Sequence, residues 1–126
     1  MQKREAIRYF ENAKELLSRS PIEDNRYTDV KYVQEACGAA YLAILKAIDE
    51  YLLEKGLTEK ELPKSVDAYR EVLKKHFAIR NGKLMREFED IYRELHIAGY
   101  YRGLLRHVEA VKTILKITKD FIGKIK

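Results

Sequence analysis

Apolar residues recur three or four positions apart along almost the whole chain, and this spacing limits the fold more than any other feature. In the first segment the residues at this spacing are Ile7, Phe10, Ala13 and Leu17. Such a period places apolar side chains on one face of a helix. No internal repeat or low-complexity tract interrupts it, and two prolines leave little punctuation for a β-rich fold. The sequence therefore predicts an all-α protein.

Caps and breaks divide this pattern into segments. Pro21 ends the first helix because the residue before a proline is pushed out of the α region. Thr28 or Asp29 is expected to cap the second helix, and Gly56 to end it. Ser65 is expected to cap the third helix. The expected helices cover 2–18, 29–54, 65–77, the stretch between the Asn81-Gly82 turn and Gly99, and the stretch from near Leu104 onward, with a short capped turn at 58–61.

These segments predict one domain over residues 1–126, since a chain of this length is typical of a single domain. The connections between the expected helices are short, which favours antiparallel neighbours. We therefore expect an antiparallel up-and-down four-helix bundle with one or two extra short helices.

Residues 36–40 read Ala-Cys-Gly-Ala-Ala in the middle of the longest expected helix. A glycine there costs about 1 kcal/mol relative to alanine, which indicates that a neighbouring backbone approaches closely at Gly38. We expect Gly38→Leu to lower the free energy of unfolding by roughly 1–3 kcal/mol through overpacking. Cys37 lies on the inner face of this helix, where a buried thiol is usually a small apolar residue and not a nucleophile.

Several classes of protein are excluded or disfavoured. A single cysteine cannot form an internal disulfide, so a disulfide-framed secreted scaffold is excluded. No apolar run reaches the ~20 residues needed to cross a bilayer, and residues 1–5 lack the apolar core of a signal peptide, so we expect a cytoplasmic protein without a membrane partner. The chain has no Gly-rich phosphate loop, no G-x-S-x-G, no C-x-x-C and no Glu-x-x-His. We expect no cofactor and no metal site, and we favour a protein that is not an enzyme.

Positive charge is concentrated in the second half of the chain. Residues 1–63 carry 10 of the 25 Lys+Arg and 12 of the 20 Asp+Glu, so residues 64–126 carry the other 15 against 8. This asymmetry is typical either of a solvated helix face or of a surface that binds RNA or an acidic partner. The cations of the last segment are Arg102, Arg106, Lys112, Lys116, Lys119, Lys124 and Lys126.

Two sets of residues are candidates for contact with a ligand or with RNA. His96 lies four residues before Tyr100, a spacing that puts both on one helical face, and Tyr41 faces inward from the longest helix. These three side chains are candidates for a pocket between helices, although a histidine bonded at the edge of the core is the other interpretation. The second set surrounds the start of the last expected helix and consists of Tyr101, Arg102, Arg106 and His107.

Five stretches carry a resemblance to known proteins. They are 13–17, 27–33, 39–41, 92–96 and 99–101, which read Ala-Lys-Glu-Leu-Leu, Tyr-Thr-Asp-Val-Lys-Tyr-Val, Ala-Ala-Tyr, Tyr-Arg-Glu-Leu-His and Gly-Tyr-Tyr. Together they resemble an uncharacterised bacterial family of small four-helix proteins that carry a domain of unknown function. The resemblance covers nearly the whole chain and implies an up-and-down bundle without a known activity.

A wider similarity concerns the spacing of arginine and histidine. Arg70 precedes His76 by six residues, and Arg102 precedes His107 by five. This pattern resembles the Arg-x(4–6)-His of the HEPN superfamily, helical domains of toxin–antitoxin and defence systems whose active members are dimeric, metal-independent ribonucleases. Ten arginines and three histidines give roughly 0.7 such matches by chance, so the pattern alone does not indicate a ribonuclease.

Two functions follow as hypotheses. The favoured one is a non-enzymatic association module that forms a homodimer or binds another protein, since the sequence holds no convincing catalytic set and its apolar pattern is broad. The alternative is a HEPN-like RNA-binding protein or ribonuclease, as a component of a toxin–antitoxin system, with RNA on the basic C-terminal helix.

Overall fold

The computed structural model describes residues 4–77 and 82–125. Its α-helices are α1 (Arg4–Leu17), α2 (Val30–Glu54), α3 (Val66–Phe77), α4 (Lys83–Ile91) and α5 (Val108–Lys124). A π-helix, η3 (Tyr92–Tyr101), continues α4 directly, and a 3-10 turn, η1, spans Glu59–Glu61. Two short strands, β1 (Ile22–Glu23) and β2 (Arg26–Tyr27), precede α2. The predicted all-α class is confirmed.

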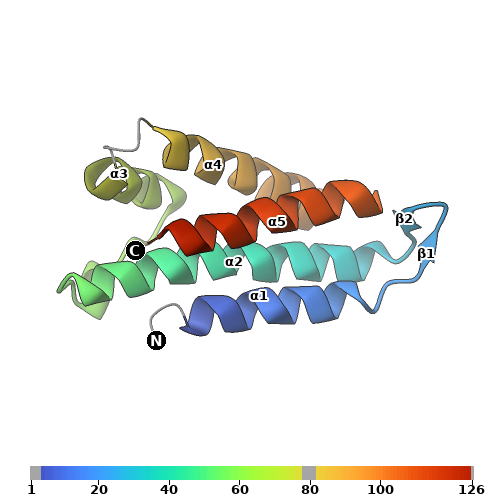
Figure 1. Cartoon of the computed structure of the whole chain (residues 1–126), viewed down its shortest axis with the longest axis horizontal. Coiled ribbons are helices and arrows are strands. Elements are labelled where there is room, and N and C mark those ends of the chain that lie inside the picture. The colour runs from blue at the N-terminus through green and yellow to red at the C-terminus, as the bar shows by residue number, and fades with distance from the viewer. Residues whose placement is uncertain (1–3, 78–81, 126) are drawn as a thin grey trace.

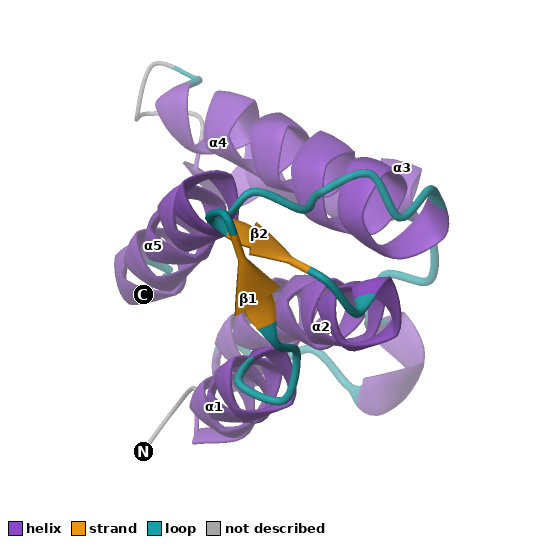
Figure 2. Ribbon diagram, turned by 90° about the vertical axis from the view of Figure 1, so that its right-hand side faces the viewer, coloured by secondary structure: helices purple, strands orange, loops and turns teal. Residues whose placement is uncertain are grey.

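Four long elements alternate in direction along the chain; three of them run lengthwise, whereas the α4–η3 helix crosses the others obliquely (Figures 1 and 2). They are α1, α2, the continuous α4–η3 helix and α5, while the shorter α3 lies across one end. The start of α1 and the end of α5 share one end of the bundle, and the β-hairpin lies at the opposite end, which faces the viewer in Figure 2. This arrangement agrees with the predicted antiparallel four-helix bundle.

The core lies along α2. This helix contacts α1, η3 and α5, and ten of its 25 residues are buried. Four of the buried residues are alanines, whose small side chains let neighbouring helices approach closely. Phe10, Phe88 and Phe121 share the same core and are almost completely buried. Burial of a side chain of this size contributes about 1.5–3 kcal/mol each.

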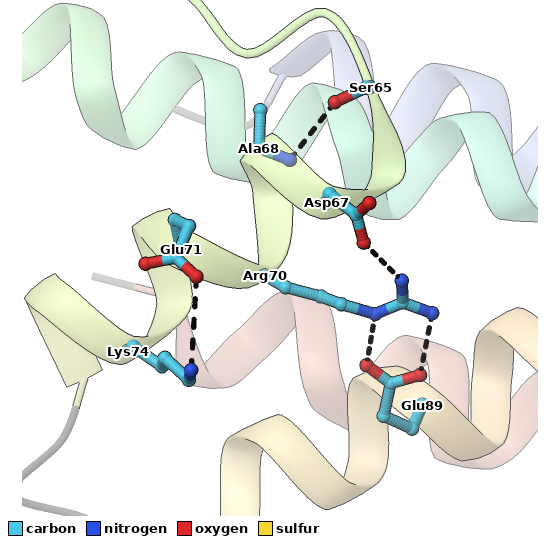
Figure 3. Close-up of polar contacts among 7 residues, drawn as sticks. All are labelled: Ser65, Asp67, Ala68, Arg70, Glu71, Lys74 and Glu89. Carbon is cyan, nitrogen blue, oxygen red and sulfur yellow. Dashed lines mark hydrogen bonds and ion pairs between the residues drawn. The ribbon is translucent and has the colours of Figure 1, made fainter.

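Three predicted caps are confirmed by their hydrogen bonds. The Asp29 carboxylate accepts from the backbone N–H two residues later, at 3.2 Å. The Thr58 N–H donates to Glu61 Oε1 at 2.7 Å, which is half of the predicted capping box. Ser65 Oγ accepts from the N–H three residues later at 3.1 Å, at the start of α3 (Figure 3). Local sequence therefore determines where these helices begin.

Two glycines also act as expected at helix ends. Gly56 follows α2 with φ of +104°, and Gly82 precedes α4 with φ of +73°. Both values are easy only for glycine. Asn81, the other residue of the predicted turn, lies outside the described residues.

Residues 22–27 form a tight β-hairpin between the first two helices, in a stretch where the sequence predicts no regular element. Strands β1 and β2 pair antiparallel, with Asp24 and Asn25 between them. These two residues have φ of +50° and +64°. A two-residue hairpin turn of type I′ has positive φ at both positions, and aspartate and asparagine tolerate it better than most residues. Strands of two residues are too short to show a period in the sequence.

The last helix begins at Val108, so the predicted start near Leu104 is wrong. Gly103 takes φ of +63° and turns the chain out of the helical path after η3. Leu104 is 63% exposed and belongs to the connection, not to the core face of a helix. Gly103 therefore ends the helical path, and a non-helical connection separates η3 from α5.

The connection 102–107 is held beside the hairpin. The Tyr27 N–H donates to the Arg106 carbonyl at 2.8 Å, and the N–H of the first residue of α5 donates to the Asn25 carbonyl at 2.9 Å. Because these backbone groups bond to the hairpin, Arg106 and His107 lie outside α5, and Arg102 caps the end of η3. The prediction that Arg106 and His107 belong to the basic last helix is therefore wrong.

Two glycines let η3 lie very close to α2. A Cβ added to Gly99 would lie 2.5 Å from Cys37 Sγ, which real side chains do not allow. A Cβ added to Gly38 would lie 3.0 Å from Cδ1 of Tyr100. The close neighbour of Gly38 is therefore an aromatic ring, and the predicted approach of a backbone is wrong.

We expect Gly99→Ala to lower the free energy of unfolding by about 1–3 kcal/mol, because the new methyl group overlaps Cys37. Gly123→Ala is the matched control: nothing lies within 4 Å of its added Cβ, so it should gain up to about 1 kcal/mol from helix propensity. Urea denaturation followed by circular dichroism measures both. Equal stability of the two variants would contradict close packing at Gly99.

Candidate functional site

Four aromatic side chains stack where η3 lies against α2. His96 is central: its ring centroid lies 4.8 Å from that of Tyr41, 5.4 Å from that of Tyr92 and 5.9 Å from that of Tyr100. The ring planes of His96 and Tyr100 differ by only 15°. The η3 members are four residues apart and share one face, while Tyr41 comes from α2. The structure thus brings together the three residues of the first predicted set, and we call the four rings the aromatic stack.

The aromatic stack borders a groove of about 560 Å³ between α1, α2 and η3. Helix α2 contacts both other helices, so its side chains line the groove between them. A groove of this volume, lined mainly by apolar and aromatic groups with a few polar ones, is typical of binding sites. The lining consists of Tyr9, Asn12 and Leu16 of α1, Glu35, Gly38, Ala39, Tyr41 and Leu42 of α2, and His96 and Tyr100 of η3.

Exposure differs among the lining residues. Leu42 is 45% exposed and Tyr100 is 49% exposed, so both present apolar surface to solvent. Tyr41 is buried, and burial raises the pKa of its phenol to about 12. Its hydroxyl therefore stays neutral near pH 7, and Tyr41 supports the stack without adding charge. The sequence analysis did not select Leu42. Its position outside the inner face of its helix could have indicated an exposed apolar side chain.

Arg70 of α3 supports the stack from outside the groove. Its guanidinium donates from Nε to one oxygen of Glu89 at 2.6 Å and from Nη2 to the other at 3.0 Å (Figure 3). It also donates to Asp67 at 2.7 Å and lies 5.3 Å from the ring centroid of Tyr92. The hydrogen bonds to Glu89 and Asp67 raise the pKa of Arg70. Planar two-point bonding of this kind fixes orientation as well as position.

The second predicted set lies at the hairpin end of the bundle. Arg102 and Arg106 are exposed on the connection 102–107, and His107 forms a β-bridge with Arg26 of the hairpin. Tyr101, which is 75% exposed, ends η3 just before them. Arg26, Arg102 and Arg106 form no ion pair with the described residues. We call Arg26, Arg102, Arg106 and His107 the basic end. The sequence analysis did not select Arg26, because its bridge to His107 joins distant parts of the sequence.

The remaining residues with reactive side chains are engaged in packing. The His76 ring packs edge-on against Tyr51, with centroids 5.7 Å apart, whereas Arg70 is bonded to Glu89. Arg70 and His76 therefore point to different neighbours. Cys37 is buried, and burial raises the pKa of its thiol to about 12. Among the residues that the structure describes, no three His, Cys, Asp or Glu side chains gather as metal ligands would, and no helix is long and apolar enough to span a membrane.

By its fold and its groove, the protein is an all-α bundle with a groove between its helices that is large enough for a ligand or a partner side chain. The chain belongs to the DUF5618 family, described as a domain of unknown function, whose profile matches residues 1–126. A similar solved structure is that of a protein of unknown function from Dyadobacter fermentans, which is 32% identical. The match covers 96% of this chain and 90% of that chain, with a TM-score of 0.79. No curated protein matches this chain. The family agrees with the predicted resemblance to uncharacterised bacterial helical proteins.

We expect the Cys37 thiol to react roughly a thousandfold more slowly with a disulfide reagent in the folded protein than in urea at pH 8. The reason is that its pKa of about 12 leaves almost no thiolate, and the sulfur is buried. Absorbance of the released thiolate measures the rate. Similar rates in both states would show an accessible, reactive thiol.

Proposed function

We propose that this protein is a non-enzymatic association module that binds a protein partner in the groove between α1, α2 and η3. The observation that carries the proposal is the exposed apolar lining of the groove, where Leu42 and Tyr100 are each almost half exposed. Apolar side chains gathered at one concave site are typical of interaction surfaces. Scattered single apolar residues on a surface would carry no such meaning.

The groove is also preorganised. Gln34 Nε2 donates to the Tyr100 carbonyl at 3.0 Å, and the Tyr100 ring is held between Gly38 and His96. A side chain that is already fixed loses little conformational entropy when a partner binds. This supports a recognition role for the wall that Tyr100 forms.

The surroundings of His96 favour binding over catalysis. A general acid or base must itself lie within hydrogen-bond reach of the group to which it gives a proton or from which it takes one. Around His96 the ring contacts are the three tyrosines of the aromatic stack, of which Tyr41 keeps its proton near pH 7. The arrangement is better suited to packing against an apolar partner than to moving protons.

Leu42→Glu should weaken binding of the neutral apolar dye Nile red roughly tenfold, because a carboxylate then stands in the apolar groove. Leu53→Glu is the matched control, since Leu53 is also exposed on α2 but does not line the groove. Fluorescence titration gives both dissociation constants. A dissociation constant that Leu42→Glu does not change, or no dye binding by the unmodified protein, would contradict the groove as a docking surface.

RNA binding at the basic end is the second candidate function. The observation that favours it is the hairpin, which adds Arg26 to Arg106 and His107 by backbone pairing. Unpaired arginines beside the exposed ring of Tyr101 are suited to a single strand, whose phosphates seek cations and whose bases stack on aromatic rings. This role is of the kind that the HEPN-like resemblance implies.

Labelled single-stranded RNA, titrated at low and moderate salt, tests this second candidate. Arg102→Ala and Arg106→Ala should each weaken binding and lower the salt slope by about 1. Lys119→Ala, an exposed cation in the second half of α5, should leave the slope unchanged. Intact RNA in the same samples would indicate binding alone, whereas cleavage lost in His107→Ala would indicate an enzyme. An affinity for RNA that does not depend on salt concentration would contradict RNA binding at the basic end.

A further inference from the structure

Glu35 brings a negative charge to the apolar groove. It lines the groove from α2, is exposed, and forms no ion pair with the described residues. Lys31 stands one turn earlier and lines an adjoining hollow together with Glu35, but the two make no ion pair. Lys46 lies over the Tyr9 ring at 5.5 Å and is about 16 Å from Glu35 along α2. The carboxylate therefore stands free at one end of an apolar surface.

The part of α2 that lines the groove has a surface against which another helix can pack. Glu35, Gly38, Ala39 and Leu42 are spaced three, one and three residues apart, so they share one face over about 10 Å. The middle two side chains are small, whereas Leu42 and Glu35 mark the two ends. The Tyr100 ring covers Gly38, so a partner side chain can approach α2 closely over Ala39, between an apolar end and a negative end.

The backbone around the groove favours a helical occupant over an extended one. An extended peptide gains most of its affinity by adding to the free edge of a sheet. Here the groove is lined by helices α1, α2 and η3, whose N–H and C=O groups are bonded within the helices. Recognition must then come from side chains, and an amphipathic helix presents apolar anchors at the required spacing.

We infer that the groove takes an amphipathic helix of a partner protein, with apolar side chains between Tyr100 and Leu16 and a lysine or arginine beside Glu35. This inference rests on the proposed function and adds the chemistry of the partner. Charge complementarity carries it, because a free carboxylate beside an apolar groove matches a cation beside an apolar helix face. The formal charge of the whole chain is +5, so general attraction would instead draw acidic partners.

Two fluorescein-labelled designed helices test the inference. Both carry the same leucine and alanine face, but one has lysines at its flanks and the other has glutamates. Fluorescence anisotropy at ~0.15 M salt, where charges farther apart than ~8 Å are screened, measures their affinity. The proteins are the unmodified chain, Glu35→Gln, Leu42→Glu and the control Glu109→Gln. Glu109 is an exposed carboxylate of α5 that does not line the groove.

We expect the lysine peptide to bind the unmodified chain more tightly than the glutamate peptide. Glu35→Gln should weaken the lysine peptide by roughly two- to fivefold and remove most of the preference, as for a rim ion pair. Leu42→Glu should abolish binding of the glutamate peptide and weaken that of the lysine peptide through loss of apolar contact. Glu109→Gln should change neither affinity.

Three results would overturn the inference. If both peptides bind equally, and only Leu42→Glu matters, the cation beside Glu35 is wrong while the proposed function stands. If neither peptide binds although Nile red does, the occupant is not an amphipathic helix. If sedimentation shows a dimer of the unmodified chain that Leu42→Glu dissociates, the occupant is a second copy. Failure of Nile red binding as well would remove the proposed function itself.

Discussion

The close packing of η3 on α2 is the contact on which the rest of the structure depends. Gly99 lies against Cys37 with no space for a Cβ, and Gly38 lies under the ring of Tyr100. Protein interiors have few voids to absorb an added carbon, so a larger residue at either glycine would push η3 outward. Tyr100 would then leave the groove wall. A π-helix of ten residues is unusual, and this one packs along α2.

The end of η3 also links the two candidate sites. Tyr100 lines the groove, the next residue, Tyr101, is exposed beside the basic end, and Gly103 turns the chain toward the hairpin. From the other side, Arg70 holds Glu89 and lies over Tyr92 at the start of η3. Element η3 therefore forms one wall of the groove and leads directly into the connection that carries the basic end, so a displacement of η3 would alter both.

Local signals made much of the fold predictable, and tertiary contacts account for what was missed. Asp29 and Ser65 begin helices as predicted because capping depends on neighbouring residues alone. The His96–Tyr100 stack also follows from helical spacing. By contrast, the start of α5 depends on hydrogen bonds to the hairpin, and Arg26 reaches His107 only through the fold. No local pattern distinguishes η3 from an α-helix, so the groove beside it was not predictable in shape.

The most direct measurement of the central claim is a nuclear Overhauser contact between the ring protons of Tyr100 and the α protons of Gly38. Close packing predicts a strong cross-peak, together with a ring-current shift of the Gly38 α protons, since an added Cβ at Gly38 would lie 3.0 Å from the Tyr100 ring. Both signals should disappear in Tyr100→Ala, while those of Gly123 should not change. A missing cross-peak in the folded protein would contradict the close contact of η3 with α2 and the groove wall built on it.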